Sequence, residues 1–139
     1  MNEKITSFKL TWHNWGLIGP NSVSKEEIIL KRHQEHFVYK KHGCCNQVYL
    51  NATIHVAPYK INNFFEFLDS IYNEWEKDYS IPICDGSAWD IQIEDISHNC
   101  TQIRGTVEYP PHGKAIEKHI REFIRDAHGE IKPRLFGCH

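Results

Sequence analysis

The stretch DGSAWDIQI, residues 85 to 93, decides the fold more than any other part of the chain. It begins with an Asp-Gly pair, which favours a turn because Asp hydrogen-bonds its own downstream backbone and Gly accepts a positive φ. Apolar and polar residues then alternate, so that Trp89, Ile91 and Ile93 share one face. The pattern predicts a strand that starts after a turn and has one buried and one solvent-facing side.

A reactive site is the alternative interpretation of this stretch, with Asp85, Asp90 and Glu94 as its carboxylates. Acid and base catalysis needs carboxylates in a shared pocket with shifted pKa values. Alternation on a solvent-facing side of a sheet supplies neither condition. We therefore interpret the stretch as structural.

A second alternating segment, TQIRGTVEY at residues 101 to 109, is the expected hairpin partner of this strand. Its apolar positions would lie opposite those of residues 89 to 93, across a turn near residues 97 to 99. These positions are Ile103, Gly105, Val107 and Tyr109.

Three segments of the first half show the same alternation and predict further strands. ITSFKLTWH covers residues 5 to 13, and EEIILKRHQEHFVYKKHG, residues 26 to 43, indicates two short strands around a turn near Gln34. NQVYLNATIHV covers residues 46 to 56 and has one apolar face, made of Val48, Leu50, Ala52, Ile54 and Val56.

Two segments have the 3.6-residue period of an amphipathic helix. The first is predicted over residues 60 to 77, and its inner positions are Ile61, Phe64, Phe65, Leu68, Ile71, Tyr72 and Trp75. The second is GKAIEKHIREFIRDA, residues 113 to 127, with inner positions Ile116, Ile120, Phe123, Ile124 and Ala127.

Strands that come in hairpins favour a largely antiparallel sheet, because parallel strands need long crossover connections. We expect an α+β fold, a two-layer sandwich of about five to six strands with both helices on one face. The length of 139 residues fits a single domain, residues 1 to 139, with residues 129 to 139 as a flexible tail.

Composition places the chain among soluble globular proteins, with 40% apolar and 24% charged residues. It has no apolar run near the roughly 20 residues that cross a bilayer, and its first residues lack the apolar stretch of a signal peptide. We therefore expect a cytoplasmic protein without a membrane partner, whose five cysteines are reduced thiols.

Residues 84 to 124 resemble a widespread group of small bacterial and prophage-encoded proteins. The C-terminal halves of those proteins have DGxxW, a strand, a turn, a strand with G and YP, and a helix, in the order that DGSAWDIQI and IRGTVEYPP show here. Many relatives have G-S/T-N-x-Y-P where this chain has GTVEYP, residues 105 to 110, so the Asn of that turn is missing. The resemblance implies a fold for this half and no activity.

The charge distribution suggests a function more than the net charge of −2 does. Residues 60 to 100 hold two Lys and nine Asp or Glu, a local charge of −7. Acidic surfaces attract the basic grooves of nucleases and other effectors and speed association with them. We therefore expect a binding protein of bacterial conflict systems, either an immunity protein or a phage-encoded inhibitor such as an anti-CRISPR.

The expected partner is another protein with a basic surface, and the contacts would come from the solvent-facing side of the first helix and the residues after it. The candidate residues are Glu66, Asp69, Asn73, Glu74, Glu76 and Asp78. Neither a cofactor nor catalysis is expected, since no Walker loop, G-x-G-x-x-G, H-E-x-x-H or G-x-S-x-G occurs. The sequence leaves the oligomeric state open.

Two alternatives remain open. A small-ligand binding protein or enzyme would stack a base or a sugar on Trp12, Trp15 and Trp89. A zinc-stabilised module would use the ligands of the segment 32 to 45, namely His33, His36, His42, Cys44 and Cys45, with Cys138 and His139 to complete a set. We expect no metal, because adjacent cysteines in an extended chain point to opposite sides.

Two further constellations favour structural interpretations. Asp95, His98 and Cys100 have the residue types of a nucleophilic site but fall in a predicted hairpin turn, where nothing excludes water. The second helix carries a basic stripe, which could meet phosphates. Glu117 and Glu122 interleave with it at helical spacing, so we expect a solvated face and no nucleic-acid partner. The stripe consists of Lys114, Lys118, Arg121 and Arg125.

Overall fold

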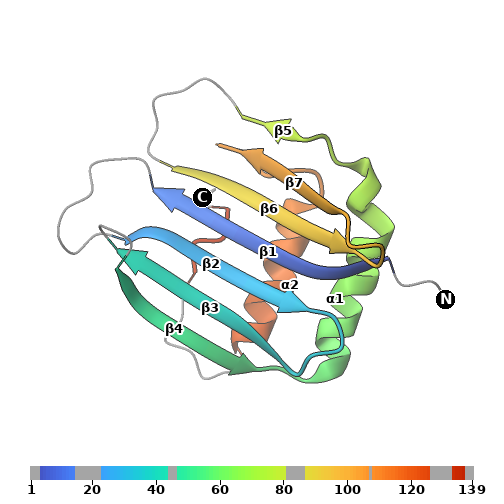
Figure 1. The fold of residues 1–139 in the computed structure, drawn as a ribbon, viewed down its shortest axis with the longest axis horizontal. Helices are drawn as coiled ribbons and strands as arrows, with labels where there is room; N and C mark the ends of the chain where they lie inside the picture. The colour runs from blue at the N-terminus through green and yellow to red at the C-terminus, as the bar shows by residue number, and fades with distance from the viewer. Residues whose placement is uncertain are drawn as a thin grey trace.

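The computed structural model describes residues 4–14, 23–43, 47–80, 87–106, 108–125 and 133–136. Within them, one seven-stranded sheet has the order β4-β3-β2-β1-β6-β7-β5, and two α-helices accompany it (Figure 1). The strands are β1 (Ile5–Asn14), β2 (Val23–Lys31), β3 (His36–Gly43), β4 (Val48–His55), β5 (Asp78–Tyr79), β6 (Ser87–Asp95) and β7 (Cys100–Gly105). The helices are α1 (Pro58–Ile71) and α2 (Gly113–Arg125), and a single 3₁₀ turn, η2 (Tyr72–Glu74), follows α1.

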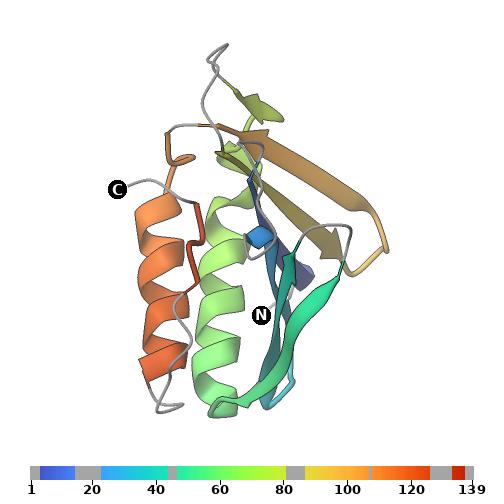
Figure 2. The ribbon, with the colours of Figure 1, turned by 90° about the vertical axis from the view of Figure 1, so that its left-hand side faces the viewer.

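The predicted α+β class and the largely antiparallel sheet are confirmed, whereas the predicted strand number is too low. The additional strand is β5, whose two residues pair in parallel with β7. Two residues carry no periodicity, so the sequence pattern could not indicate this strand. Figure 2 shows α1 and α2 side by side against one face of the sheet, which leaves the other face without a helix.

The predicted hairpin of β6 and β7 is present, with Trp89 opposite Gly105 and Ile91 opposite Ile103. β7 ends at Gly105, earlier than predicted, so Tyr109 lies after the strand and Val107 lies outside the described residues. Trp89 also lies opposite Trp12 of β1, so its indole is at the centre of the sheet and fully buried. A Cβ atom on Gly105 would overlap the six-membered ring of this indole. Glycine is therefore required at residue 105 for close packing, because any larger residue would displace Trp89.

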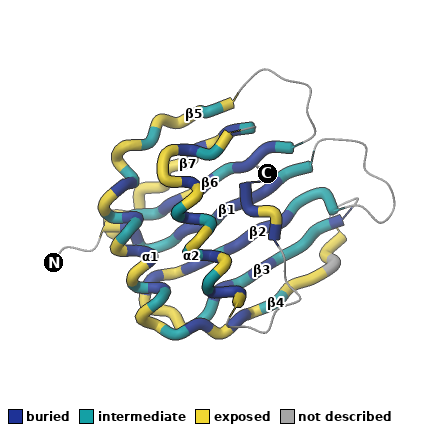
Figure 3. Tube along the Cα trace, turned by 180° about the vertical axis from the view of Figure 1, so that it is seen from behind, coloured by how far each residue is buried: buried dark blue, intermediate teal, exposed yellow. Residues whose placement is uncertain are grey.

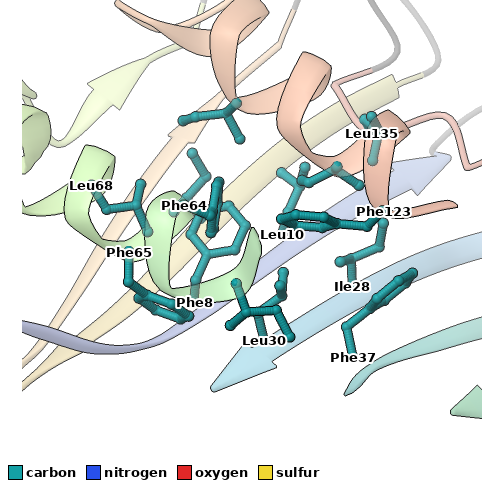
Figure 4. Packing of buried hydrophobic residues seen from close by; sticks show 14 of the residues in the cluster. Phe8, Leu10, Ile28, Leu30, Phe37, Phe64, Phe65, Leu68, Phe123 and Leu135 are labelled. Carbon is teal, nitrogen blue, oxygen red and sulfur yellow. The ribbon is translucent and has the colours of Figure 1, made fainter. Parts of the chain in front are cut away.

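The core lies between the sheet and the helices and consists of aliphatic residues with a group of contacting phenylalanine rings (Figure 4). Phe64 of α1 contacts Phe8 of β1 edge to face, with ring centroids 5.1 Å apart, and Phe123 of α2 at 5.9 Å. Edge-to-face contacts of this kind add to the stabilisation from burial. The predicted inner stripe of the first helix is confirmed, since Ile61, Phe64, Phe65, Leu68 and Ile71 are all buried.

The first helix ends earlier than predicted. The α-helix stops at Ile71, and after the 3₁₀ turn Trp75 has an extended backbone conformation. Its indole N–H still donates a hydrogen bond of 2.8 Å to the carbonyl of Pro111, so Trp75 is partly buried between α1 and the start of α2. Of the predicted stripe of α2, Ile116, Ile120, Phe123 and Ile124 are buried, and Ala127 lies outside the described residues.

Residues 133 to 136 belong to the segment that the sequence indicated as a flexible tail, and the structure packs them against the sheet instead. Leu135 and Phe136 are part of the core, and the Phe136 ring contacts Trp89 at 5.2 Å. The backbone N–H of Arg134 donates to the buried Glu26 carboxylate, which also accepts a hydrogen bond from the Tyr39 hydroxyl. Burial, together with this hydrogen bond, raises the pKa of Tyr39.

One predicted face is only partly buried. Ile54 and Val56 of the segment after residue 46 are buried, whereas Val48 and Leu50, at the other end of β4, are 53% and 39% exposed. None of the described helices is long and apolar enough to cross a membrane.

Candidate functional site

Most of the predicted partner-binding residues lie where helix α1 ends and the chain continues to β5. Figure 3 shows the outer sides of the helices, on which exposed positions recur along α1 and α2. We define the acidic surface as Glu66, Asn73, Glu74, Glu76 and Asp78, all of which are exposed. Among the described residues, no ion pair involves Glu66 or Glu76. Both side chains are exposed, so the fold does not depend on their charges.

Two other members of the acidic surface make local contacts. Glu74 pairs with His112, whose Nε2 atom lies 3.3 Å from Glu74 Oε2. Asp78 accepts hydrogen bonds from the side chain and the backbone N–H of Ser80, and these lower its pKa. Asp78 therefore remains ionised at neutral pH and contributes its full negative charge to the acidic surface.

The structure removes Asp69 from the predicted partner-binding set. Its carboxylate accepts hydrogen bonds from the backbone N–H groups of Lys4 and Ile5, at 3.2 and 2.9 Å, and lies 2.9 Å from Nη1 of Arg32. The Arg32 side chain is only 5% exposed, and that of Asp69 15%. Asp69 thus joins α1 to β1 and to the turn after β2, and the expectation that it faces solvent is wrong.

The helix-free face of the sheet holds two ionic clusters that the sequence analysis did not find. In the first, the buried Glu27 carboxylate lies 3.0 Å from Nζ of Lys9, 3.2 Å from Nε2 of His42 and 3.7 Å from Nζ of Lys25. Burial raises the pKa of Glu27, but the hydrogen bond and charge of Lys9, with help from His42 and Lys25, outweigh burial and hold it below its ordinary value. These four residues come from three neighbouring strands, which only the strand order brings together.

The second cluster pairs His13 of β1 with Asp90 of β6, whose Nε2 and Oδ2 atoms are 2.7 Å apart. They line a depression of about 170 Å³ that also contains Arg104 and Ser80. A histidine held by a carboxylate is the pair that a general base uses, but nucleophilic catalysis also needs a hydroxyl beside the histidine. The Ser80 side chain instead bonds to Asp78. The pair therefore supports the structural interpretation of Asp90.

A larger depression, of about 490 Å³, lies over β2, β3 and β4 on the same helix-free face. Ile29 and Val38, which are paired across β2 and β3, are its apolar residues, and Lys31 and Lys40 are its charged ones. The described lining contains no carboxylate. Its other polar residues are Gln34, His36, Asn51 and Thr53.

Glu94 and Asp95, at the end of β6, make contacts within the β6–β7 hairpin. Asp95 accepts hydrogen bonds from the backbone N–H groups of Asn99 and Ser97, and the bond from Asn99 contributes most to lowering its pKa. Nδ1 of His98 lies 3.0 Å from Oε1 of Glu94, and the exposed Cys100 is paired with Glu94 across β6 and β7. Asp85 lies outside the described residues.

The three described histidines of the predicted zinc set, His33, His36 and His42, form no metal cluster. His36 and His42 stand at opposite ends of β3, and six residues of extended chain span about 20 Å. His42 is bound to Glu27, and His33 sits in the turn between β2 and β3 with a φ of 67°. Residues 44, 45, 138 and 139 lie outside the described part of the chain, and within that part no three His, Cys, Asp or Glu side chains form a metal cluster.

Trp12 and Trp89, two of the tryptophans that the ligand alternative requires, are buried. Trp89 is buried and donates its indole N–H to the carbonyl of Glu108, and Trp12 is covered by the guanidinium of Arg134, 4.6 Å from its ring. Neither ring leaves a free face on which a base or sugar could stack, and Trp15 lies outside the described residues.

The basic stripe of α2 is interleaved with carboxylates as expected. Arg121 pairs with Glu117 at 3.0 Å, and Arg125 lies 3.8 Å from Glu122. These pairs neutralise half of the stripe, and exposed pairs of this kind contribute little to stability. The face is therefore mixed in charge.

No protein-family model matches the chain, and no curated protein matches it either. The candidate site therefore depends on the geometry of this chain alone, and the resemblance of residues 84 to 124 stays a prediction.

Proposed function

We propose that the chain is a non-enzymatic binding protein that captures another protein through the acidic surface. The observation that carries the proposal is the contrast between the carboxylates of residues 66 to 78. Asp69 is used to hold the fold together, whereas Glu66 and Glu76 are exposed and, among the described residues, are in no ion pair. Exposed carboxylates without an ion pair leave a local negative field for a partner.

The chemistry of the partner follows from this field. A complementary protein would present lysines and arginines, as the nucleic-acid-binding groove of a nuclease or of an effector complex does. A phage-encoded inhibitor or an immunity protein of a bacterial conflict system would act in this way, by occupying such a groove. The two clusters of the helix-free face do not compete for this role, because the Glu27 carboxylate is already paired with Lys9 and the Asp90 carboxylate with His13.

The test combines capture with a charge-matched control. The wild-type chain is used to capture a partner from its native host, the partner is purified, and its affinity is measured for two triple variants. The first reverses Glu66, Glu74 and Glu76 to Lys within the acidic surface. The second reverses Glu35, Glu108 and Glu122 to Lys, which changes the net charge equally at positions outside it.

We expect the first variant to bind at least about tenfold more weakly and the second to stay within about threefold of wild type, since each factor of ten is about 1.4 kcal/mol. Affinity should also fall between about 50 and 300 mM salt, because salt screens exposed charges. Unchanged affinity of the first variant, or equal losses in both, would contradict a role for the acidic surface. Thermal unfolding of each variant checks that the fold is intact.

A further inference from the structure

The two edges of the sheet differ in a way that points to a second interaction surface. One edge is β5, which has only two residues and includes the charged Asp78. The other edge is β4, which has eight residues and pairs on one side only, with β3 (Figure 1). Short or charged edge strands prevent sheets from joining, whereas a long edge strand offers a row of backbone N–H and C=O groups to another strand.

The β4 edge lacks two of the usual protections, charged residues and proline. Residues 48 to 55 contain no Lys, Arg, Asp, Glu or Pro, the residues that most often keep an edge strand from pairing. The register shift between β3 and β4 lies at one end, near His42, so the rest of the strand is regular. No described element lies outside this edge in the sheet order.

Exposed apolar side chains gather at the same edge. Four large hydrophobic residues are exposed among those the structure describes, and three of them, Val48, Leu50 and Tyr59, lie on β4 or in the first turn of α1 directly after it. Scattered exposed apolar residues are common, but a group beside an unpaired edge marks an interaction site. The fourth, Ile96, lies in the turn between β6 and β7.

We propose that β4 pairs antiparallel with β4 of a second copy of this chain, so that the two seven-stranded sheets join into one continuous sheet. A two-fold axis perpendicular to the sheet produces this pairing and keeps the helices of both copies on the same side. Antiparallel pairing places the start of one strand beside the end of the other. Val48 and Leu50 of one copy then lie near the end of the partner's β4, where the partner's α1 begins with its exposed Tyr59.

This self-complementarity is the reason for choosing a second copy over an unrelated strand. Because the two-fold axis makes the two halves of the interface identical, Val48 and Leu50 of each copy lie near Tyr59 of the other copy. The uncharged strand also creates no like-charge contact with itself. The pairing strand β4 lies at the opposite edge of the sheet from β5, which carries Asp78 of the acidic surface.

The interface is small, so the dimer should be weak. A single pair of eight-residue strands with a few side chains buries less than the roughly 1,600 Å² of a standard stable interface. We therefore expect a dissociation constant on the order of 10 to 100 μM. Sedimentation equilibrium of the full chain, from about 2 to 300 μM, measures the constant across this range.

Matched variants locate the interface. Leu50→Glu places a negative charge on the strand that would pair with the second copy. Within the monomer the new carboxylate lies opposite Lys41 of β3, and this opposite charge makes the substitution tolerable for the fold. We expect this variant to raise the dissociation constant at least tenfold, and Ile96→Glu, which adds the same charge to a similarly exposed apolar residue, to leave it unchanged. If Leu50→Glu fails to fold, Val48→Glu replaces it, because Val48 is 53% exposed.

Hydrogen exchange gives a readout that does not depend on variants. Backbone amides of β4 that point away from β3 should exchange at least about tenfold more slowly at high than at low protein concentration, and those of the β6–β7 turn should not change. A chain that stays monomeric over the whole range overturns the proposal. So does a dimer that Leu50→Glu leaves intact, because such a dimer would form elsewhere.

Discussion

Nη1 of Arg32, in the turn after β2, lies 2.9 Å from Oδ2 of Asp69 on α1, and this pair is nearly enclosed by the protein. Arg32 Nη1 also donates to the carbonyl of Ile5, and Asp69 Oδ1 accepts from the backbone N–H of Ile5. The start of β1, the turn after β2 and the last turn of α1 thus meet at one ion pair. A partner protein could not use Asp69 without breaking this junction.

Asp69→Ala should therefore destabilise the fold without touching the acidic surface. Removal of the Asp69 carboxylate takes an ion-pair partner from the nearly buried Arg32 guanidinium and a hydrogen-bond acceptor from the Ile5 N–H, which costs about 3 kcal/mol. Urea denaturation measures the loss, and Glu66→Ala, at an exposed position of the same helix, should change the free energy of unfolding by less than about 0.5 kcal/mol. Equal effects of the two substitutions would show that Asp69 is as dispensable as a surface residue.

Leu68→Ala tests the inner face of α1. Leu68 is fully buried in the core between the helices and the sheet, so its truncation leaves a cavity. We expect a loss of about 2 to 5 kcal/mol in the free energy of unfolding with an unchanged denaturant slope. A loss below about 0.5 kcal/mol would place this helix face outside the core.

Phe136→Ala tests whether the C-terminal segment is part of the fold. The Phe136 ring is buried against Trp89 and Tyr109, so we expect its removal to cost about 3 to 5 kcal/mol. The tryptophan fluorescence of the folded protein should also shift, because the Trp89 indole loses a neighbour. If the variant has the stability and the fluorescence spectrum of wild type, residues 133 to 136 do not contribute to the packing of the core.

Glu27 should make stability depend on pH in the acid range. Its pKa is lowered in the folded protein from an ordinary value of 4.5, so the unfolded chain binds the proton more tightly. The ionised carboxylate therefore stabilises the fold above that value, and this contribution is lost as the pH falls through the lower folded value. Below about pH 5, the free energy of unfolding should fall more steeply for wild type than for Glu27→Gln.

Denaturation in urea at a series of pH values gives both profiles. Glu35→Gln, at an exposed position on the turn before β3, serves as the control and should follow the wild-type profile. Parallel profiles for wild type and Glu27→Gln would mean that the cations around Glu27 do not favour its ionised form.

The sequence by itself determined the local elements. Alternation predicted β6 and β7 and their pairing, because Trp89, Ile91 and Ile103 bury their side chains only in that phase. The helical period predicted the inner faces of α1 and α2, since a helix must bury its apolar stripe wherever it packs. It also predicted that the carboxylates of the β6–β7 turn are structural, which the hydrogen bonds of Asp95 now explain.

Only the tertiary structure decided the neighbours across the sheet and the role of each charge. The order β2-β1-β6 brings Glu27 to Lys9 and Asp90 to His13, and no periodicity within one segment contains that information. Asp69 and Glu66 look alike in the sequence, on the outer side of the same helix, but one meets Arg32 from a turn 37 residues away. Periodicity reports which face of an element is buried, whereas ion pairs and sheet edges depend on which distant segments arrive beside it.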